Sequence, residues 1–272
     1  EDGRSLTFTS RPLEDSLDVL GFPEVTVKLS VDRPNALLAV RLCEVFPSGA
    51  STRLSWGLLN LTHRHGHQKA VLLEPGEQSE VMVRLNAVGC WIASGNRLRV
   101  ALSETYWPEA WPSPEPVIVH LLGGTLDLPV RATVEEPDIP AFEIPEGAPE
   151  LEVETLREGG REQTYGQDIL TGRSEIRVGT DSGRVRFDNG LETELSALDT
   201  WKIQETDPLS AEARSDWITE YKRGTWETRV ETRSRMWSDR ERFYVSNEVT
   251  AYEGSETVFS RTQTFDVERE GC

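Results

Sequence analysis

The sequence VTVKLSVD at residues 25–32 decides the fold class, because apolar and polar residues alternate in it without a break. Successive side chains of a strand point to opposite faces, so this period of two indicates a strand with one buried face. The sequence ALLAVRLCEV at residues 36–45 is apolar on both faces at first, which is typical of a strand in a sandwich core. We therefore expect both segments to belong to a β-sandwich.

Further strand patterns surround this pair, and no stretch with a helical period interrupts them. They cover residues 6–10, 16–20, 53–62, 80–86, 97–103 and 116–122. Turn-forming residues separate them at 47–49, 74–76 and 94–96. This density of short strands predicts a jelly-roll (galactose-binding-like) β-sandwich over residues 1–130.

The second half of the chain has a different character. Residues 131–150 interleave four prolines with six acidic residues, which predicts a stiff, extended linker. Residues 151–272 then predict a second domain, an antiparallel β-meander. One signal is Asn189-Gly190, which we expect to form a type I′ hairpin turn. The other is the strictly alternating segment 226–237, in which one face is charged and is expected to lie open to water.

Composition excludes several classes of protein. The net charge of −18 would repel phosphate, so we expect no nucleic-acid partner. No apolar run is long enough for a membrane helix, so we expect no membrane partner. Three cysteines are too few for a disulfide scaffold and fit buried free thiols and a cytoplasmic location.

The first residue is Glu1 and no signal peptide follows, which suggests a trimmed start or a piece of a longer polypeptide. Asn60-Leu61-Thr62 matches a glycosylation sequon, but it lies in a strand pattern, and we interpret it as coincidental.

Catalytic motifs are missing. A nucleophile elbow needs G-x-S-x-G on a strand–turn–helix, and the near matches at residues 3–7, 49–53 and 172–176 each lack the second glycine. The four histidines end at His120, so the second half has no imidazole base. We expect no catalytic residue in this chain, and the sequence holds no dinucleotide or phosphate-loop motif that would indicate a cofactor.

The best metal candidate is the set His63, His65 and His67, which would share one face of an extended strand. Arg64 would place a positive charge beside the cation, and Gly66 indicates a loop. We therefore favour a solvated turn and expect no bound metal.

The sequence YWPEAWPSP at residues 106–114, here called the aromatic segment, contains Tyr106, Trp107 and Trp111 braced by prolines. Prolines prevent regular strand pairing, so the segment should project as a loop. The indoles could seal one end of the sandwich, form an interdomain contact or substrate-pocket rim, or stack on sugars. We expect Tyr106, Trp107 and Trp111 to be partly exposed and to mediate docking or self-association.

In their order along the chain, several of these segments resemble one family. They are Gly21–Val25, Val31–Leu42, Gly57–Arg64, Gly95–Val100, Tyr106–Pro108 and Trp111–Pro114. Together they resemble the C-terminal region of CocE/NonD serine hydrolases, which are related to Xaa-Pro dipeptidyl-peptidases. Phe187–Leu191, Asp207–Ala211 and Ala251–Gly254 resemble a β extension found in one branch, whereas Glu268–Cys272 departs from the family pattern.

The resemblance implies a non-catalytic jelly roll that packs on an N-terminal α/β-hydrolase domain of the same parent polypeptide. That domain carries the Ser, Asp and His of the parent serine hydrolase, and none of the three matches a position here. The jelly roll would help to wall the substrate pocket of an acyl, ester or Xaa-Pro peptide hydrolase and could support a homodimer. The alternatives are a free-standing carbohydrate-binding module using Trp91, Trp107 or Trp111, and a purely structural, dimer-forming unit.

Overall fold

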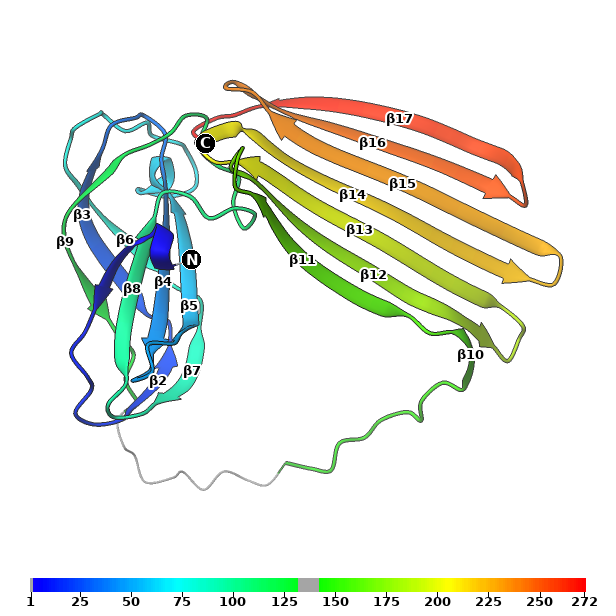
Figure 1. The fold of residues 1–272 in the computed structure, drawn as a ribbon, viewed down its shortest axis with the longest axis horizontal. Coiled ribbons are helices and arrows are strands. Elements are labelled where there is room, and N and C mark those ends of the chain that lie inside the picture. Colours follow the sequence, from blue (N-terminus) through cyan, green and yellow to red (C-terminus); the bar gives the residue numbers. More distant parts are fainter. Residues whose placement is uncertain (1, 132–141) are drawn as a thin grey trace. The chain divides into compact units, whose positions relative to one another are not determined.

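The computed structural model describes residues 2–131 and 142–272. They form two compact units, each described by itself: unit 1 comprises residues 2–131 and 270–272, and unit 2 runs from Phe142 to Arg269. Both units consist of antiparallel strands (Figure 1), and the helices of the described residues are two short 3₁₀ helices, η1 (Asp2–Arg4) and η2 (Leu61–His63). The predicted all-β fold class is confirmed. Half of the linker predicted over residues 131–150 lies outside the described residues, namely 132–141; residues 142–150 are exposed and form no regular secondary structure.

Unit 1 is a sandwich of short strands. The strands are β1 (Leu6–Thr9), β2 (Leu17–Gly21), β3 (Glu24–Val31), β4 (Leu37–Val45), β5 (Ser51–Asn60), β6 (Ser79–Arg84), β7 (Val88–Ile92), β8 (Arg97–Ser103) and β9 (Val119–Asp127). One sheet has the order β1-β8-β4-β5 and a second has the order β6-β3-β9, while β2 pairs with β7.

The hydrophobic core lies between these sheets. The strand β3 follows the predicted alternation, since Val25, Val27, Leu29 and Val31 are at most 3% exposed while Lys28 faces water. These residues cluster with leucines and valines of β4, β6 and β8. All nine residues of β4 are buried, so this strand is covered on both faces.

Two strands depart from the sequence prediction. No strand was expected at β7, which is only five residues long and contains Gly89. The strand β9 begins at Val119 and continues to Asp127, past the predicted end at residue 122. Its glycines carry no strand signal, yet Gly124 is required there, because a Cβ atom would lie 2.7 Å from the carbonyl oxygen of Thr26 on β3.

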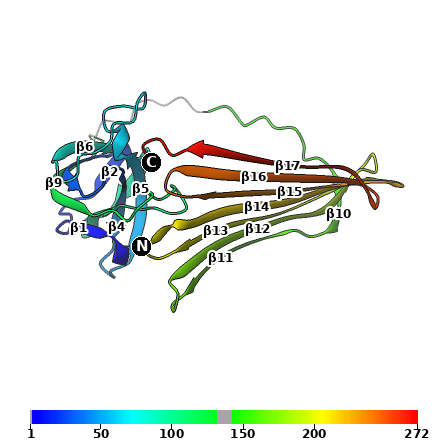
Figure 2. The same ribbon diagram turned by 90° about the horizontal axis from the view of Figure 1, so that it is seen from above.

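Unit 2 is a single eight-stranded antiparallel sheet. Its strands are β10 (Val153–Arg157), β11 (Gly160–Asp168), β12 (Arg173–Phe187), β13 (Glu192–Gln204), β14 (Asp207–Arg223), β15 (Trp226–Ser238), β16 (Arg242–Glu253) and β17 (Glu256–Glu268). From β12 to β17 each strand pairs with the next in sequence, as in the predicted meander, and β10 and β11 both pair with β12 (Figures 1 and 2).

The sheet of unit 2 has two chemically different faces. Directly paired residues lie on the same face of an antiparallel sheet, so the register assigns Trp217, Ala197 and Thr232 to one side. This side, here called the apolar face, is rich in aromatic residues, Val, Ala and Thr. The other side, here called the charged face, carries the charged residues of the segment 226–237 as predicted.

The turn predicted at Asn189-Gly190 exists, but its predicted type is wrong. The amide of Phe187 donates to the carbonyl of Leu191, and the amide of Gly190 donates back to the carbonyl of Phe187. Within this turn only Gly190 has a positive φ, of 77°, whereas a type I′ turn would need one at Asn189 as well. The hairpin therefore uses a three-residue loop with its glycine in the left-handed region.

The C-terminal residues 270–272 pack within unit 1. The side-chain amide of Asn60 donates to the carbonyl oxygen of Gly271 at 2.7 Å, and the hydroxyl of Thr62 donates to the same oxygen at 2.6 Å. The side-chain Oδ1 atom of Asn60 also accepts a hydrogen bond from the backbone amide of Thr62 and thereby caps η2. The sequon at Asn60 is thus a folding element, consistent with its interpretation as coincidental.

We predict that Gly271→Ala destabilises the chain more than Gly49→Ala does. Both glycines have a positive φ, but a Cβ at Gly271 would lie 2.5 Å from the Cβ of Ala70, whereas one at Gly49 meets no atom within 4 Å. Urea denaturation should give a loss of about 1 kcal/mol for Gly49→Ala and about 2–3 kcal/mol for Gly271→Ala. Equal losses would mean that the C-terminal residues are not docked.

Candidate functional site

The outer face of β4 carries the groups that hold the aromatic segment. Arg41 on β4 pairs directly with Trp56 on β5, and Cys43 pairs with Arg53 across a register shift. These side chains point away from the core, because Val40 and Leu42, which alternate with Arg41 and Cys43 along β4, point into it. Because of this pairing between β4 and β5, the guanidinium groups of Arg41 and Arg53 and the indole of Trp56 lie on the same surface.

Arg41 is a buried charge with several partners. Its side chain is 3% exposed, and its Nη2 donates to the Ser5 hydroxyl at 2.7 Å and lies 3.6 Å from the Asp2 carboxylate. Its guanidinium carbon lies 5.6 Å from the ring centre of Tyr106, within the range of a cation–π contact. Burying a charge is costly unless it is paired and hydrogen-bonded, so these contacts fix the position of Arg41.

The Asp2 carboxylate belongs to the same cluster. Burial alone would raise its pKa, but hydrogen bonds from Arg99 and Ser51 outweigh that effect and leave the pKa lowered. The carboxylate lies 2.8 Å from Nη1 of Arg99. The group therefore remains ionised near neutral pH and compensates the charge of Arg41.

Tyr106 connects the aromatic segment to this surface. Its hydroxyl accepts a hydrogen bond from Nη1 of Arg53 at 2.5 Å, and its ring lies 5.8 Å from that of Trp56 at a tilt of 53°. Together with the contact to Arg41, these interactions hold the aromatic ring on three sides. Tyr106 is consequently half-buried and acts as the anchor of the segment.

Trp107 and Trp111 follow this anchor and are also half-buried. Their rings meet edge to face, with centres 5.0 Å apart and planes at 88°. The Nε1 atom of Trp107 is buried and has no hydrogen-bond partner among the described residues. Since that nitrogen is the only polar atom of the indole, the part of Trp107 that reaches solvent is entirely carbon.

Sequence reasoning found the aromatic segment but missed its supports. Arg41 interrupts an apolar run, and a charge inside a fully buried strand is the signal that could have identified it. A hollow of about 300 Å³ elsewhere in unit 1 was also missed; it is lined by Phe8, Thr9, Ser10, Leu98, Val100 and Leu126. Its lining is uncharged.

The near matches to a nucleophile motif do not form an elbow. Ser51 is the first residue of β5 and Ser174 lies inside β12, whereas an elbow serine sits at a turn between a strand and a helix. Ser5 accepts a hydrogen bond from Arg41. Each of the three serines thus occupies a structural position.

The histidine set lies in η2 and the turn that follows it, not in an extended strand. The rings of His63 and His67 stack with centres 5.4 Å apart. Among residues 2–131 and 142–272, no group of three or more His, Cys, Asp or Glu side chains is arranged to hold a metal ion. Over the same residues, no helix is long and apolar enough to cross a membrane.

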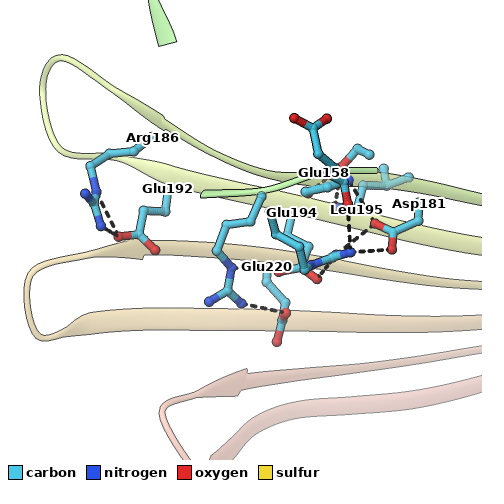
Figure 3. A network of polar contacts seen from close by, with 11 residues as sticks. Glu158, Asp181, Arg186, Glu192, Glu194, Leu195 and Glu220 are labelled. Atoms are coloured by element: carbon cyan, nitrogen blue, oxygen red, sulfur yellow. Dashed lines mark hydrogen bonds and ion pairs between the residues drawn. The ribbon is translucent and has the colours of Figure 1, made fainter. Parts of the chain in front are cut away.

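Several carboxylates on the charged face of unit 2 pair with arginines (Figure 3). Arg157 lies 2.6 Å from Asp181 and 2.5 Å from Glu194, and Arg184 joins Glu194 to Glu220. In the same picture, the Arg186 side chain pairs with Glu192 at 2.7 Å. This network is a ladder of ion pairs running across neighbouring strands.

The electrostatics of the ladder oppose acid catalysis. The hydrogen bond from Arg157 lowers the pKa of Asp181 to about 2, with a further contribution from the Gly183 amide. The Arg186 hydrogen bond likewise lowers the pKa of Glu192. A glycosidase needs one carboxylic acid with a raised pKa, and the pKa values of Asp181 and Glu192 are shifted in the opposite direction.

The fold and the candidate site define a β-sandwich unit with an anchored aromatic surface. A family model described as the X-Pro dipeptidyl-peptidase C-terminal non-catalytic domain matches residues 1–136, half of the chain. The chain belongs to this family, which confirms the resemblance found in the sequence. No curated protein matches the chain significantly.

Solved structures of hydrolases resemble part of the chain. An aminopeptidase from the marine sediment archaeon Thaumarchaeota archaeon is 18% identical, with a TM-score of 0.44 over 47% of this chain and 26% of its own. An alpha-amino acid ester hydrolase is 18% identical, with a TM-score of 0.45 over the same shares. A CocE/NonD family hydrolase from Staphylococcus aureus is 15% identical, with a TM-score of 0.37 over 39% of this chain and 23% of its own. The chain thus spans about a quarter of the length of these proteins.

We predict that Arg41→Ala destabilises the chain by about 2–4 kcal/mol, because it leaves a cavity at a buried position and removes the contacts of Arg41 with Ser5, Asp2 and Tyr106. The control Arg53→Ala removes an exposed guanidinium from the same tyrosine and should cost less than about 1 kcal/mol. Urea denaturation at neutral pH measures both. Similar costs for the two variants would contradict a special role for the buried arginine.

We predict that the Asp181 carboxyl titrates near pH 2 and that Arg157→Gln moves its pKa towards the ordinary value of 3.8. Since the folded-state pKa is depressed, the stabilisation from this group is present above pH 3.8 and is lost as the pH falls through about 2. Carbon-detected NMR titration of the carboxyl groups measures the change. An unshifted Asp181 in the unsubstituted chain would contradict the ladder.

Proposed function

We propose that this chain is the accessory C-terminal β region of a CocE/NonD-type α/β-hydrolase that cleaves acyl, ester or Xaa-Pro peptide bonds. Its partner is the catalytic α/β-hydrolase domain of the same parent polypeptide. Unit 1 packs on that domain through Tyr106, Trp107 and Trp111 and helps to shape the rim of the substrate pocket. The observation that carries the proposal is the half-exposed aromatic segment anchored on the outer face of β4.

The chemistry of the segment suits a protein interface. Trp107 turns its nitrogen inward and offers carbon to the outside, so it favours an apolar partner surface. The anchoring of Tyr106 by Arg41 and Arg53 holds the loop in one conformation before docking. A preorganised aromatic loop loses little conformational entropy on binding, and buried aromatics dominate interface energies.

A free-standing carbohydrate-binding module is the second candidate. Sugar stacking needs an open indole face, and the edge-to-face contact between Trp107 and Trp111 covers a face of one of these two rings. Trp91 on β7 is 66% exposed and would be the stacking residue of such a module. This difference lets Trp91 serve as a control in the test of docking.

We predict that Trp107→Ala and Trp111→Ala each weaken binding of the separately expressed hydrolase domain about 10–100-fold, as loss of an interface anchor does. Trp91→Ala should leave the affinity unchanged. Isothermal titration calorimetry measures the affinities, and circular dichroism confirms that each variant is folded. A folded Trp111→Ala variant with unchanged affinity would refute docking through the segment, and oligosaccharide binding abolished by Trp91→Ala would favour the alternative.

A further inference from the structure

Within residues 142–269, which form unit 2, no second layer of structure packs on the apolar face, although a sheet of this composition needs one. Figures 1 and 2 show its eight strands in one layer. Large apolar side chains remain open on this face, including Trp217 at 42%, Tyr221 at 41% and Phe265 at 50% exposure. From the strand register, five further apolar side chains belong to the same face, and each is more than 40% exposed: Val153, Tyr165, Trp226, Phe259 and Val267. Apolar sheet faces are normally buried against another layer, and open patches of this kind mark interaction sites.

The dimensions of the face match a stable protein interface. The sheet is seven strands wide, because β10 and β11 both pair with β12 on the same side. Seven strands spaced about 4.8 Å apart and about 13 residues long, at about 3.3 Å per residue, give a face of about 1,400 Å². A standard interface buries about 800 Å² on each partner. The occupant must therefore be broad and flat, which favours another sheet over a small ligand.

The charge distribution also favours a self-complementary contact. The register places few charged residues on this face, and they balance as three basic and three acidic: Arg161, Arg223, Arg261, Asp199, Glu253 and Glu256. All except Asp199 lie on an edge strand or at a hairpin end. Asp199 accepts a hydrogen bond from Ser215, whose oxygen accepts one from Nε1 of Trp217. A chain of net charge −18 thus presents one broad face without net repulsion towards its own copy.

We propose that the apolar face of unit 2 is the interface between two copies of this chain. The two sheets pack face to face around a twofold axis as a two-layer sandwich, with strands within about 30° of each other and about 10 Å between layers. Each copy supplies the layer that the other lacks, and both charged faces remain in water. The interface is separate from the aromatic segment, so it goes beyond the proposed docking on a hydrolase domain.

Sedimentation equilibrium of the full chain tests this proposal, with Trp217→Glu as the disruptive variant. Its matched control is Ile218→Glu, which places the same charge one residue away at a side chain 38% exposed, on the charged face. We expect a particle of twice the 30.6 kDa chain mass for the unsubstituted chain and for Ile218→Glu. For Trp217→Glu we expect a dissociation constant raised about 100-fold.

A second variant protects the test against misfolding. Thr232→Glu introduces the charge at the exposed cross-strand neighbour of Trp217 and should also dissociate the dimer. Trp111→Ala should leave the dimer intact, which separates this interface from the aromatic segment. A monomeric unsubstituted chain, dimers unaffected by folded Trp217→Glu and Thr232→Glu variants, or equal dissociation by Ile218→Glu would each overturn the proposal.

Discussion

A strand that is buried on both faces must be covered on both sides, and in unit 1 that strand is β4. Its inner face, with Leu38, Val40 and Leu42, completes the core of the sandwich. Its outer face carries Arg41, whose charge must be compensated by neighbours that are not part of the sheet. The short helix η1 and the aromatic segment supply that cover, so the position of the candidate docking surface follows from the burial of one strand.

The two units differ in where their apolar side chains lie. In unit 1 the sheets pack against each other around a hydrophobic core, and the hydrophobic cluster of the described residues lies entirely within unit 1. Unit 2 separates its residues by face, with arginine–carboxylate pairs such as Arg184–Glu194 on one side and aromatic and β-branched residues on the other. Exposed ion pairs contribute little stability individually, so the charged face mainly keeps that side of the sheet in water. The apolar face is then the side that requires a partner.

Local patterns in the sequence predicted the elements whose signal is local. The strands β3 and β15 were found because alternation with a period of two is visible within eight to twelve residues. The strand β7 was missed because it is short, and the end of β9 because Gly123 and Gly124 carry no strand signal although close strand packing requires Gly124.

The supports of the site were beyond such patterns, because they depend on contacts between distant segments. Arg41 meets Tyr106 and Asp2, and Asn60 meets Gly271, only after the sheets have formed. The aromatic segment itself could be found from its composition, since tryptophans braced by prolines are unusual at any position. The register of unit 2, which separates its apolar face from its charged face, could be predicted only for the strand with strict alternation.

We propose that this chain assists a hydrolase and that the hydrolase domain carries the chemistry. The most direct measurement is the hydrolysis of p-nitrophenyl acetate and Ala-Pro-p-nitroanilide by the purified chain, by the separate hydrolase domain and by their mixture. We expect no turnover by the chain alone and a higher kcat/KM for the mixture than for the hydrolase domain alone. Turnover by the chain that survives repurification and is abolished by Ser51→Ala or Ser174→Ala would contradict it.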